Sequence, residues 1–435
     1  MKEKIMIVEC ISSAVNYVKD IYDEGYEPVL LEPYCQMVAR PYMRAMHDHD
    51  LDFMLPPGTK RPRIVSAKRT YEDTLKIVKK ISPALIIPGS DAGIELATKL
   101  SHDLGLIGND PKNLPKMRNK FICQQALAKA GIRSIQSKVT SDYEEALDFY
   151  KKMRSQGKKM ILKPISGISS LGVFVINSQN ELKKALSFNQ GFIGKMYNGG
   201  SKNDVLLQEF IDGEEYIFNT VSCRGKHKVT LVSKNCKVVQ NGRKLYDYEI
   251  LVPVDSEEYR LIEDYGKKVL DAIGIEYGTV HSEIMVDKDG PVLIEANCRL
   301  CGRNMFSSFL DECMGFHESK ESLLSYLRPD YYLENCLDEK VKIIKPYIVK
   351  YISLQNNAFV FHLKIEELFE KLPGYRYYYS HSKFGFLPKT TDLSSALAYV
   401  FFAFENEKGI QNILDFIHDL EENHPEKFYK GFRLL

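Results

Sequence analysis

The chain has 435 residues, too many for one ordinary hydrophobic core, so length predicts two to four packed units. Hydrophobic residues make up 44% and charged residues 27%, which excludes an intrinsically disordered chain. The formal net charge is +1, so no charge excess favours nucleic acid or an anionic membrane surface as a partner.

The N-terminus and the cysteines indicate a cytoplasmic protein. The opening MKEKIMIVEC has no apolar run long enough for a signal peptide or a membrane span, because Glu9 interrupts it. Nine cysteines, an odd number spread along the chain, fit reduced thiols better than disulfides. Cys298 and Cys301 form a single C-x-x-C pair, but no second pair or histidine spacing completes a zinc site, so metal or redox use of the pair is disfavoured.

The predicted elements begin with a βαβ unit. Apolar runs at 4–10 and 27–33 flank a segment of helical periodicity, which predicts a parallel sheet. The Pro-rich stretch at 41–63 is expected to be an irregular loop. Within it, His47 and His49 are expected in a solvated polar segment rather than in a metal site.

A second strand, turn and helix follow. Residues 84–87 read as a buried strand, and residues 93–106 read as an amphipathic helix. The turn between them carries Gly89, Ser90 and Asp91 at the carboxyl end of a parallel strand, where open α/β sheets bind ligands. Either these residues border a site, or Asp91 caps the helix that follows.

The pattern then changes from helices to strands. Helices are predicted at 121–129 and 141–154, after which residues 159–176 read as two strand-forming runs joined by a Gly/Ser loop, which is a hairpin. Further strand-like runs follow as far as 296, with one strong helix at 257–273. Clustered strands indicate antiparallel sheets, so the prediction is an α+β body behind an α/β front. The last hundred residues mix helix and strand without a readable motif.

The Gly/Ser loop, Gly167-Ile168-Ser169-Ser170-Leu171-Gly172, has a composition suited to anion binding. Two glycines and two small hydroxyl residues let backbone N–H groups approach a phosphate, and Lys163 ends the preceding strand. No Gly-Lys-Ser/Thr ends the loop, so it is not a Walker loop. Taken alone, the loop is a weak signal, because a Gly/Ser turn is more often an ordinary turn.

The segment HSEIMVDKDGPVLIEANCR predicts a hairpin that carries paired acids. Glu283 and Glu295 fall near the same level of two antiparallel strands, and period two can place both on one face. Two carboxylates on a half-buried face repel unless a cation lies between them. Asn297 adds a third oxygen, which favours Mg²⁺, and Arg299 is aimed at the same face, where it suits a phosphate or an anionic intermediate. The alternative is a surface hairpin with scattered charges.

Two weaker signals surround this hairpin. The strand LLQEF stops at Asp212-Gly213 and resumes as EEYIF. Such a break can present backbone groups to a base edge and a carboxylate to ribose hydroxyls, or it is simply a turn. Asp247 and Glu249 could pair with a substrate ammonium, or they are ordinary loop charges.

The motifs of this chain, taken in their order, resemble those of the ATP-grasp superfamily. They are Lys120, Lys163, the Gly/Ser loop, QEFIDGEE and Glu283…Glu295-Ala-Asn-Cys-Arg299. The resemblance covers about residues 84–303 and is strongest to carboxylate-amine ligases of the L-amino acid ligase type. It implies four units: an N-terminal α/β domain with a parallel sheet at 1–112, a lid region at 113–207, a larger antiparallel α+β catalytic domain at 208–330, and a C-terminal α+β subdomain at 331–435.

The resemblance also implies the site residues and cofactors. The ATP phosphates would be contacted by Lys120, Lys163 and the loop residues Gly167, Ser169, Ser170 and Gly172; adenine by Gln208, Glu209 and Ile211; and ribose by Glu215. One or two Mg²⁺ ions, with Mn²⁺ as an alternative, would be held by Glu283, Glu295 and Asn297. The catalytic set would be Arg299, Lys163, Glu283 and Glu295.

The implied activity is an ATP-dependent ligase that forms an amide bond through an acyl phosphate and releases ADP and phosphate. Its substrates would be small molecules, either two amino acids or an amino acid and an amine. The sequence leaves open whether the protein forms a homodimer. Transfer of the γ-phosphoryl group needs no Ser or Cys nucleophile, and none is evident. The alternatives are a bicarbonate-using carboxylase or carbamoyl-forming enzyme, and a non-catalytic nucleotide-binding regulator. Cys298 and Cys301 stand where relatives commonly have Pro and Gly, so the loop that leads to Arg303 is expected to differ in shape.

Overall fold

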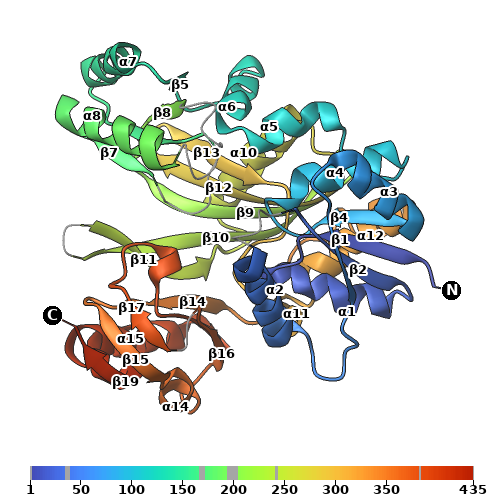
Figure 1. Ribbon diagram of the computed structural model, residues 1–435. Helices are drawn as coiled ribbons and strands as arrows, with labels where there is room; N and C mark the ends of the chain where they lie inside the picture. The colour runs from blue at the N-terminus through green and yellow to red at the C-terminus, as the bar shows by residue number, and fades with distance from the viewer. Residues whose placement is uncertain are drawn as a thin grey trace.

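The computed structural model describes residues 2–34, 40–165, 172–193, 204–240, 243–381 and 384–434. Their strands form four sheets, and the strands β9, β10 and β12 of the largest run through the middle of the molecule (Figure 1). Three of the positions expected in the site, Gly167, Ser169 and Ser170, lie outside the described residues.

The first sheet is parallel and has the strand order β3-β2-β1-β4. The middle strands are buried, as expected for strands enclosed by helices, and the predicted βαβ start is confirmed. The elements of this unit are β1 (Lys4–Val8), α1 (Asn16–Asp23), β2 (Glu27–Glu32), α2 (Arg40–Met54), β3 (Arg63–Ser66), α3 (Tyr71–Ile81), β4 (Leu85–Pro88) and α4 (Gly93–Asp103).

One prediction for this unit is wrong, because the start of the 41–63 stretch is helix α2 and not a loop. Its proline lies in the first turn, where no backbone N–H is required, and the next two prolines follow the helix end. Leu51 and Met54 are each 1% exposed and pack in the N-terminal core. His47 is also buried, so it does not lie in a solvated segment.

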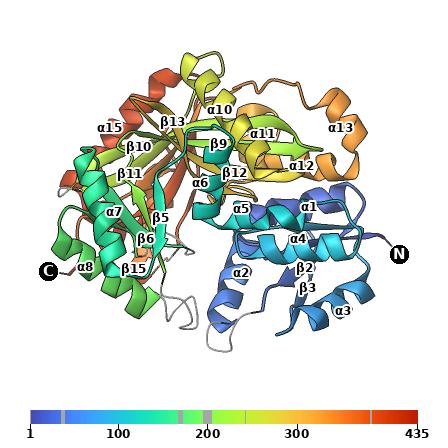
Figure 2. The same cartoon turned by 90° about the horizontal axis from the view of Figure 1, so that it is seen from above.

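The second sheet is a small lid with the antiparallel order β5-β8-β6-β7. Strands β6 and β7 form the hairpin that the sequence predicts. Figure 2 shows two helices of the lid packed beside this sheet. The elements from α4 onward are α5 (Leu114–Arg118), α6 (Lys120–Lys129), β5 (Ser137–Thr140), α7 (Tyr143–Ser155), β6 (Met160–Pro164), β7 (Phe174–Ile176), α8 (Gln179–Phe188) and β8 (Val205–Glu209).

The third sheet has eight strands in the order β13-β12-β9-β10-β11-β14-β18-β16, and every pair is antiparallel. This confirms the antiparallel α+β body. Its elements are β9 (Glu214–Cys223), β10 (Lys226–Gln240), β11 (Arg243–Leu251), α10 (Glu257–Ile273), β12 (Gly278–Asp287), β13 (Gly290–Asn297), α11 (Ser307–Met314), α12 (Glu318–Leu327), α13 (Pro329–Asn335), β14 (Tyr347–Ile352), β16 (Tyr375–Tyr379) and β18 (Ala398–Ala403).

The last hundred residues therefore continue the central sheet through β14, β18 and β16. They also form a fourth sheet, with the order β17-β15-β19. Its elements are β15 (Ala358–Leu363), α14 (Ile365–Phe369), β17 (Gly385–Leu387), α15 (Ile410–Asn423) and β19 (Tyr429–Arg433). Among the described residues, no helix combines the length and apolar character needed to cross a membrane.

A buried histidine joins the N-terminal unit to the central body. His317 Nε2 lies 3.0 Å from Asp20 Oδ1 of α1, and its Nδ1 lies 2.7 Å from Asp311 Oδ1. Burial alone would lower the pKa of His317, but hydrogen bonds and negative charge from the two aspartates outweigh it and raise this pKa to about 9. The charged histidine thus stabilises the contact between the two units.

We expect this contact to weaken in alkaline solution. The folded-state pKa of His317 lies above its ordinary value. The contribution of the charged histidine to stability, at most about 3 kcal/mol, is therefore complete below about pH 6.5 and is lost as the pH rises through about 9. In urea unfolding, His317→Gln should be much less stable than wild type at acid pH, and the gap should narrow at alkaline pH. His102→Gln, an exposed position on α4, should show no pH-dependent gap. A constant gap for His317→Gln would contradict this assignment.

Candidate active site

The β12–β13 hairpin brings the two predicted acids together. Glu283 and Glu295 are direct partners across the antiparallel pair, and Asn297 is opposite His281. Side chains of directly opposed residues share one face of a sheet, so both carboxylates point the same way. Both residues are half-buried and Asn297 is buried. The hairpin therefore has the geometry that its sequence pattern predicts.

A line of polar contacts runs from this hairpin to the N-terminal unit. Lys120 Nζ donates to Glu295 Oε1 at 2.8 Å. With its amide nitrogen turned toward the acids, Asn297 donates to Glu295 Oε1 and to Asp91 Oδ1, at 3.0 Å each. Arg299 donates through Nε and Nη2 to Asp91 Oδ2, at 3.1 and 2.8 Å. Donors and acceptors alternate along this line, with a cation paired to each acid and the neutral Asn297 amide between the two acids.

The position of Asp91 shows which of its two expected roles, helix cap or site residue, is excluded. The N-cap of α4 is Ala92, without a side-chain cap, so Asp91 does not cap the helix but faces Arg299. The turn requires glycine at position 89, because a Cβ there would lie 2.5 Å from the carbonyl oxygen of Glu9. Burial, together with the charge of Asp91, raises the pKa of Glu9 to about 7, a perturbed group that sequence patterns did not reveal.

The charges of the hairpin and of the lid strand perturb one another. Burial raises the pKa of Glu283 to about 8, and the negative charges of Glu215 and Glu295 act in the same direction. Burial lowers the pKa of Lys163 to about 8, helped by the positive charge of Lys120. Two carboxylates on one face, with the amide of Asn297 beside them, form a polar set of the kind that Mg²⁺ prefers. The residues present therefore fit a divalent cation.

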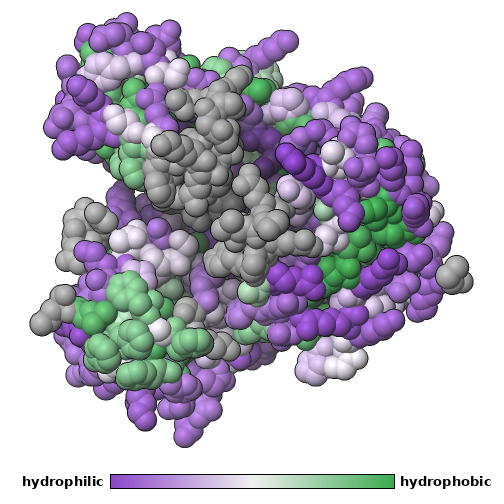
Figure 3. Space-filling model, viewed as in Figure 1, coloured by the Kyte–Doolittle hydropathy of each residue, from purple (hydrophilic) through white to green (hydrophobic). Residues whose placement is uncertain are grey.

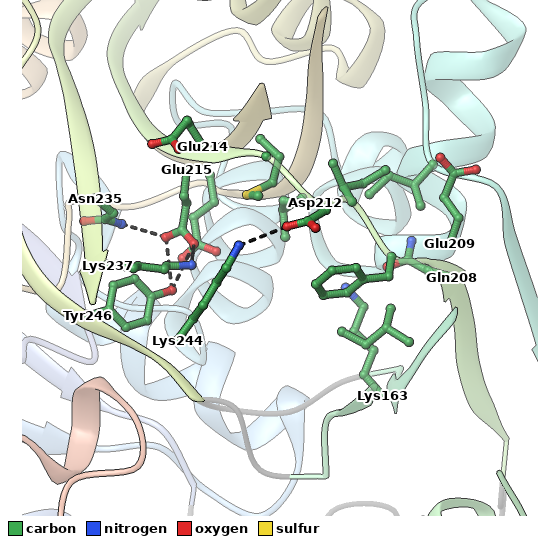
Figure 4. Close-up of a pocket in the computed structure, with 18 of the residues that line it drawn as sticks. Lys163, Gln208, Glu209, Asp212, Glu214, Glu215, Asn235, Lys237, Lys244 and Tyr246 are labelled. Atoms are coloured by element: carbon green, nitrogen blue, oxygen red, sulfur yellow. Dashed lines mark hydrogen bonds and ion pairs between the residues drawn. The ribbon is translucent and has the colours of Figure 1, made fainter. Parts of the chain in front are cut away.

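A cavity of about 340 Å³ lies beside these groups, between the lid sheet and the central sheet (Figure 4). Lys163 and Gln208 line it from the lid, while Ile211 and Glu215 line it from the connection into β9. The side chain of Gln208 donates to Ser137 Oγ at 2.8 Å, and that of Glu209 bonds to Lys158 at 2.8 Å. These two side chains are bound elsewhere, and the backbone N–H groups of Glu209 and Phe210 donate to the carbonyl oxygens of Gln136 and Lys159 at 3.0 and 2.9 Å.

Glu215 is held in the cavity wall by residues that sequence reasoning missed. Its carboxylate accepts from Asn235 Nδ2 at 2.6 Å, from Lys237 Nζ at 2.5 Å and from Tyr246 Oη at 3.0 Å (Figure 4). Lys244 of the same β10–β11 hairpin bonds to Asp212 at 2.9 Å. Asn235 and Lys237 are two residues apart on one strand, a period-two pattern that could have been noticed but named no partner.

Gly172, which ends the Gly/Ser loop, is within the described residues. Its φ of +80° is in the left-handed region, which favours glycine. Its carbonyl oxygen accepts a hydrogen bond from Asn189 Nδ2 at 2.9 Å. This bond joins the end of the loop to the residue that follows helix α8.

Asp247 and Glu249 are not loop charges, because both are buried in β11. Asp247 binds Lys350 Nζ at 2.8 Å and His418 Nε2 at 2.9 Å. Asp247, His418 and Glu421 are close enough to hold a metal ion, but the Lys350 ammonium already lies among them. Glu249 forms a buried ion pair with Arg303. Asp247 is therefore not available to a substrate ammonium.

The loop after β13 is packed by its cysteines. Cys298 and Cys301 are both buried, and burial raises the pKa of each thiol to about 12. Arg303 follows in the same loop and donates to Asn235 Oδ1 at 3.2 Å. The eight cysteines among the described residues are free thiols. The two thiols thus act as small apolar groups that pack this loop.

Residues 156–307 match the sequence family described as ATP-grasp domain. Dapdiamide A synthase of Enterobacter agglomerans is 26% identical over 337 residues, which is 77% of this chain and 76% of that protein. Alanine–anticapsin ligase of Bacillus subtilis strain 168 is 25% identical over 255 residues, or 55% of this chain and 53% of that protein.

A solved structure extends the similarity to nearly the whole fold. L-amino acid ligase from Bacillus licheniformis superposes with a TM-score of 0.72 at 15% identity and covers 96% of this chain and 98% of its own. The fold, the matched domain and the ordered motifs agree with one another. Residues 156–307 are therefore an ATP-grasp domain, as the order of the sequence motifs predicted, and the chain as a whole shares the fold of that L-amino acid ligase.

Proposed function

We propose that this protein is an ATP-dependent carboxylate-amine ligase that joins two amino acids, or an amino acid and an amine. The observation that carries the proposal is the line of polar contacts in which Lys120 binds Glu295, the Asn297 amide bridges Glu295 and Asp91, and Asp91 binds Arg299. These contacts join the β12–β13 hairpin to the N-terminal unit, so the phosphate of ATP and the carboxylate of a substrate can meet where the two units adjoin. The names of the two curated relatives, an alanine ligase and a dapdiamide synthase, support the same class of reaction.

The chemistry has two steps. A carboxylate oxygen attacks the γ-phosphorus of ATP, the bond from this phosphorus to the bridging oxygen breaks, and ADP leaves. The amine then attacks the carbonyl carbon of the acyl phosphate, phosphate leaves, and the amine nitrogen loses a proton. Because phosphate is a far better leaving group than oxide, the protein need only position the reactants and balance charge.

We assign the phosphates to Lys163, Lys120 and the Gly/Ser loop, whose members are Gly167, Ser169, Ser170 and Gly172. Adenine would meet the backbone of Gln208, Glu209 and Ile211, and the ribose would meet Glu215. The cavity supports these assignments for the residues that line it, Lys163, Gln208, Glu209, Ile211 and Glu215. Arg299 would stabilise the charge of the acyl phosphate, and closure of the lid would exclude water from it.

We assign Glu283, Glu295 and Asn297 to one or two Mg²⁺ ions, for which Mn²⁺ could substitute. Bound there, the ions would neutralise phosphate charge. The division into domains at 1–112, 113–207, 208–330 and 331–435 stays part of this proposal.

An ADP-release assay tests the proposal. With ATP, Mg²⁺ and pairs of amino acids, ADP and phosphate should appear in equal amounts only when both a carboxylate and an amine are supplied. Release of AMP and pyrophosphate would contradict the acyl-phosphate route. Bicarbonate-dependent and amine-independent ADP release would instead identify a carboxylase, and ATP binding without turnover would identify a regulator.

Hydroxylamine can replace the unknown amine. It should trap the acyl phosphate as a hydroxamate, which mass spectrometry would identify, so that the carboxylate substrate is found without knowledge of its partner. Failure to form any hydroxamate while ADP is released would contradict an acyl-phosphate intermediate.

A further inference from the structure

The C-terminal sheet β17-β15-β19 has one covered face and one bare face. On the covered face, Ala358 and Val360 are fully buried and pack in one core with Ile413 and Ile417 of α15. Period two turns the alternate residues of each strand away from that core. The bare face is formed by Phe359, Phe361, Phe386 and Phe432, which we call the phenylalanine face.

The phenylalanine face is continuous across all three strands. Phe359 is the direct partner of Phe386 on one side and of Phe432 on the other. The Phe359 and Phe432 rings are stacked with centroids 5.6 Å apart, and Phe361 contacts both at 5.6 and 6.0 Å. The four residues are 37%, 61%, 57% and 50% exposed. Figure 3 shows the corresponding apolar patch on the part of the surface formed by the C-terminal sheet.

We propose that the phenylalanine face is the interface between two copies of this chain. Since one aromatic side chain carries roughly 200 Å² of surface, the four exposed fractions amount to about 400 Å² of apolar area. This is the size of the largest apolar patch on a typical protein, about 300–600 Å², and such patches are often functional. Two such faces remove about 800 Å², so the rim residues of the two copies need to add about 200 Å² to reach the roughly 1,000 Å² of a specific interface.

A second copy fits this face better than other occupants. A flat row of rings on a sheet is self-complementary under a two-fold axis, the commonest symmetry of soluble oligomers. The rim carries both signs of charge, with Lys430 on β19 and the His362–Glu367 pair on β15 and α14, and the whole chain has a net charge of +1. Two copies therefore do not repel each other. The rings lie stacked on the sheet instead of protruding from a loop, which does not suit insertion into a lipid surface.

The location of the face separates dimerisation from catalysis. β15, β17 and β19 lie at the end of the molecule far from the lid elements β5, β7 and α7 (Figure 1). Two copies joined there keep both nucleotide cavities open, so the interface can be broken without a loss of ATP turnover.

Sedimentation equilibrium of the full chain at micromolar concentration tests the proposal. Wild type should be a dimer, and Phe361→Glu should raise the dimer dissociation constant at least about 100-fold, because the charge falls on the interface of both copies. Phe432→Ser should weaken the dimer in the same direction without introducing a charge. Phe416→Glu, at a 39% exposed phenylalanine of α15 outside the face, is the matched control and should remain dimeric.

Three results would overturn the proposal: a monomeric wild type, an unchanged dimer in both face variants, or a monomeric Phe416→Glu. Co-sedimentation with vesicles of phosphatidylcholine and phosphatidylserine tests the alternative that the face binds a membrane. If wild type binds these vesicles and Phe361→Glu does not, the face is a membrane surface and the proposal is wrong. ATP-dependent turnover should be the same in wild type and in the face variants, which separates this test from that of the ligase activity.

Discussion

Glu295→Gln should abolish ATP turnover, with a loss of about 10³-fold or more, while the protein remains folded. Glutamine keeps the shape of the side chain but removes one of the two carboxylate charges on the β12–β13 hairpin. Lys120 loses its counter-charge at the same time, since its Nζ bonds to Glu295 at 2.8 Å. Because the pair is partly exposed, its loss should lower the free energy of unfolding by only about 1 kcal/mol.

The measurement is kcat for ADP release at saturating ATP and Mg²⁺, together with the urea midpoint. Asp289→Asn is the matched control, since Asp289 is at the turn of the same hairpin and contacts only Lys288 through its carboxylate among the described residues. It should turn over like wild type. A Glu295→Gln protein with a tenth or more of wild-type turnover would refute the assignment of this residue to the metal site.

Lys163→Met should weaken ATP binding by at least about 10-fold and at the same time stabilise the protein. Lys163 is 9% exposed, and among the described residues no ion pair or side-chain hydrogen bond of its ammonium is found. Burial of an unpaired charge costs stability, which is why the pKa of this lysine falls to about 8. Methionine fills a similar space without a charge, so the variant should gain roughly 1 to 3 kcal/mol at neutral pH.

The gain should depend on pH. The folded-state pKa of about 8 is below the ordinary 10.5, so the unfolded chain binds the proton more tightly and the cost is complete below about pH 8. The cost, and with it the advantage of methionine, should disappear as the pH rises toward about 10.5. Urea midpoints at neutral and alkaline pH, with calorimetric ATP titrations, measure both effects. Lys152→Met, at an exposed position of α7, should change neither. A destabilised Lys163→Met that binds ATP normally would contradict a phosphate-binding role.

Local patterns were sufficient for much of the hairpin chemistry. The sequence places Glu283 and Glu295 near the same level, because the DKDG turn nearly fixes the register of the hairpin. The turn alone would set Glu283 opposite Ile294, and a register shift between Glu283 and Ile284 makes Glu295 its partner. The βαβ start and the helix at 257–273 were likewise predicted, since their periodicity is contained within one element. The error at α2 came from proline, which breaks a helix interior but is tolerated in a first turn.

Contacts between distant segments were not predictable in this way. Asp91 and Arg299 are 208 residues apart, and their ion pair depends on how the N-terminal sheet packs against the central body. Glu215 was read as a ribose ligand, but nothing local indicated that Asn235, Lys237 and Tyr246 would hold its carboxylate. Hydrophobic periodicity shows which face of a strand is buried but not which strand lies beside it.

The sequence by itself determined which chemical groups are expected in the site: the lysines, the paired acids and the Gly/Ser loop. It also determined their order, which is that of an ATP-grasp chain. It did so because each motif needs particular residue types at a fixed local spacing. Only the tertiary structure decided that Asp91 faces Arg299, that the last hundred residues extend the central sheet, and that four phenylalanines meet on one bare face. The reason is physical, since strand order and packing between units arise from burial summed over the whole chain, which no short pattern contains.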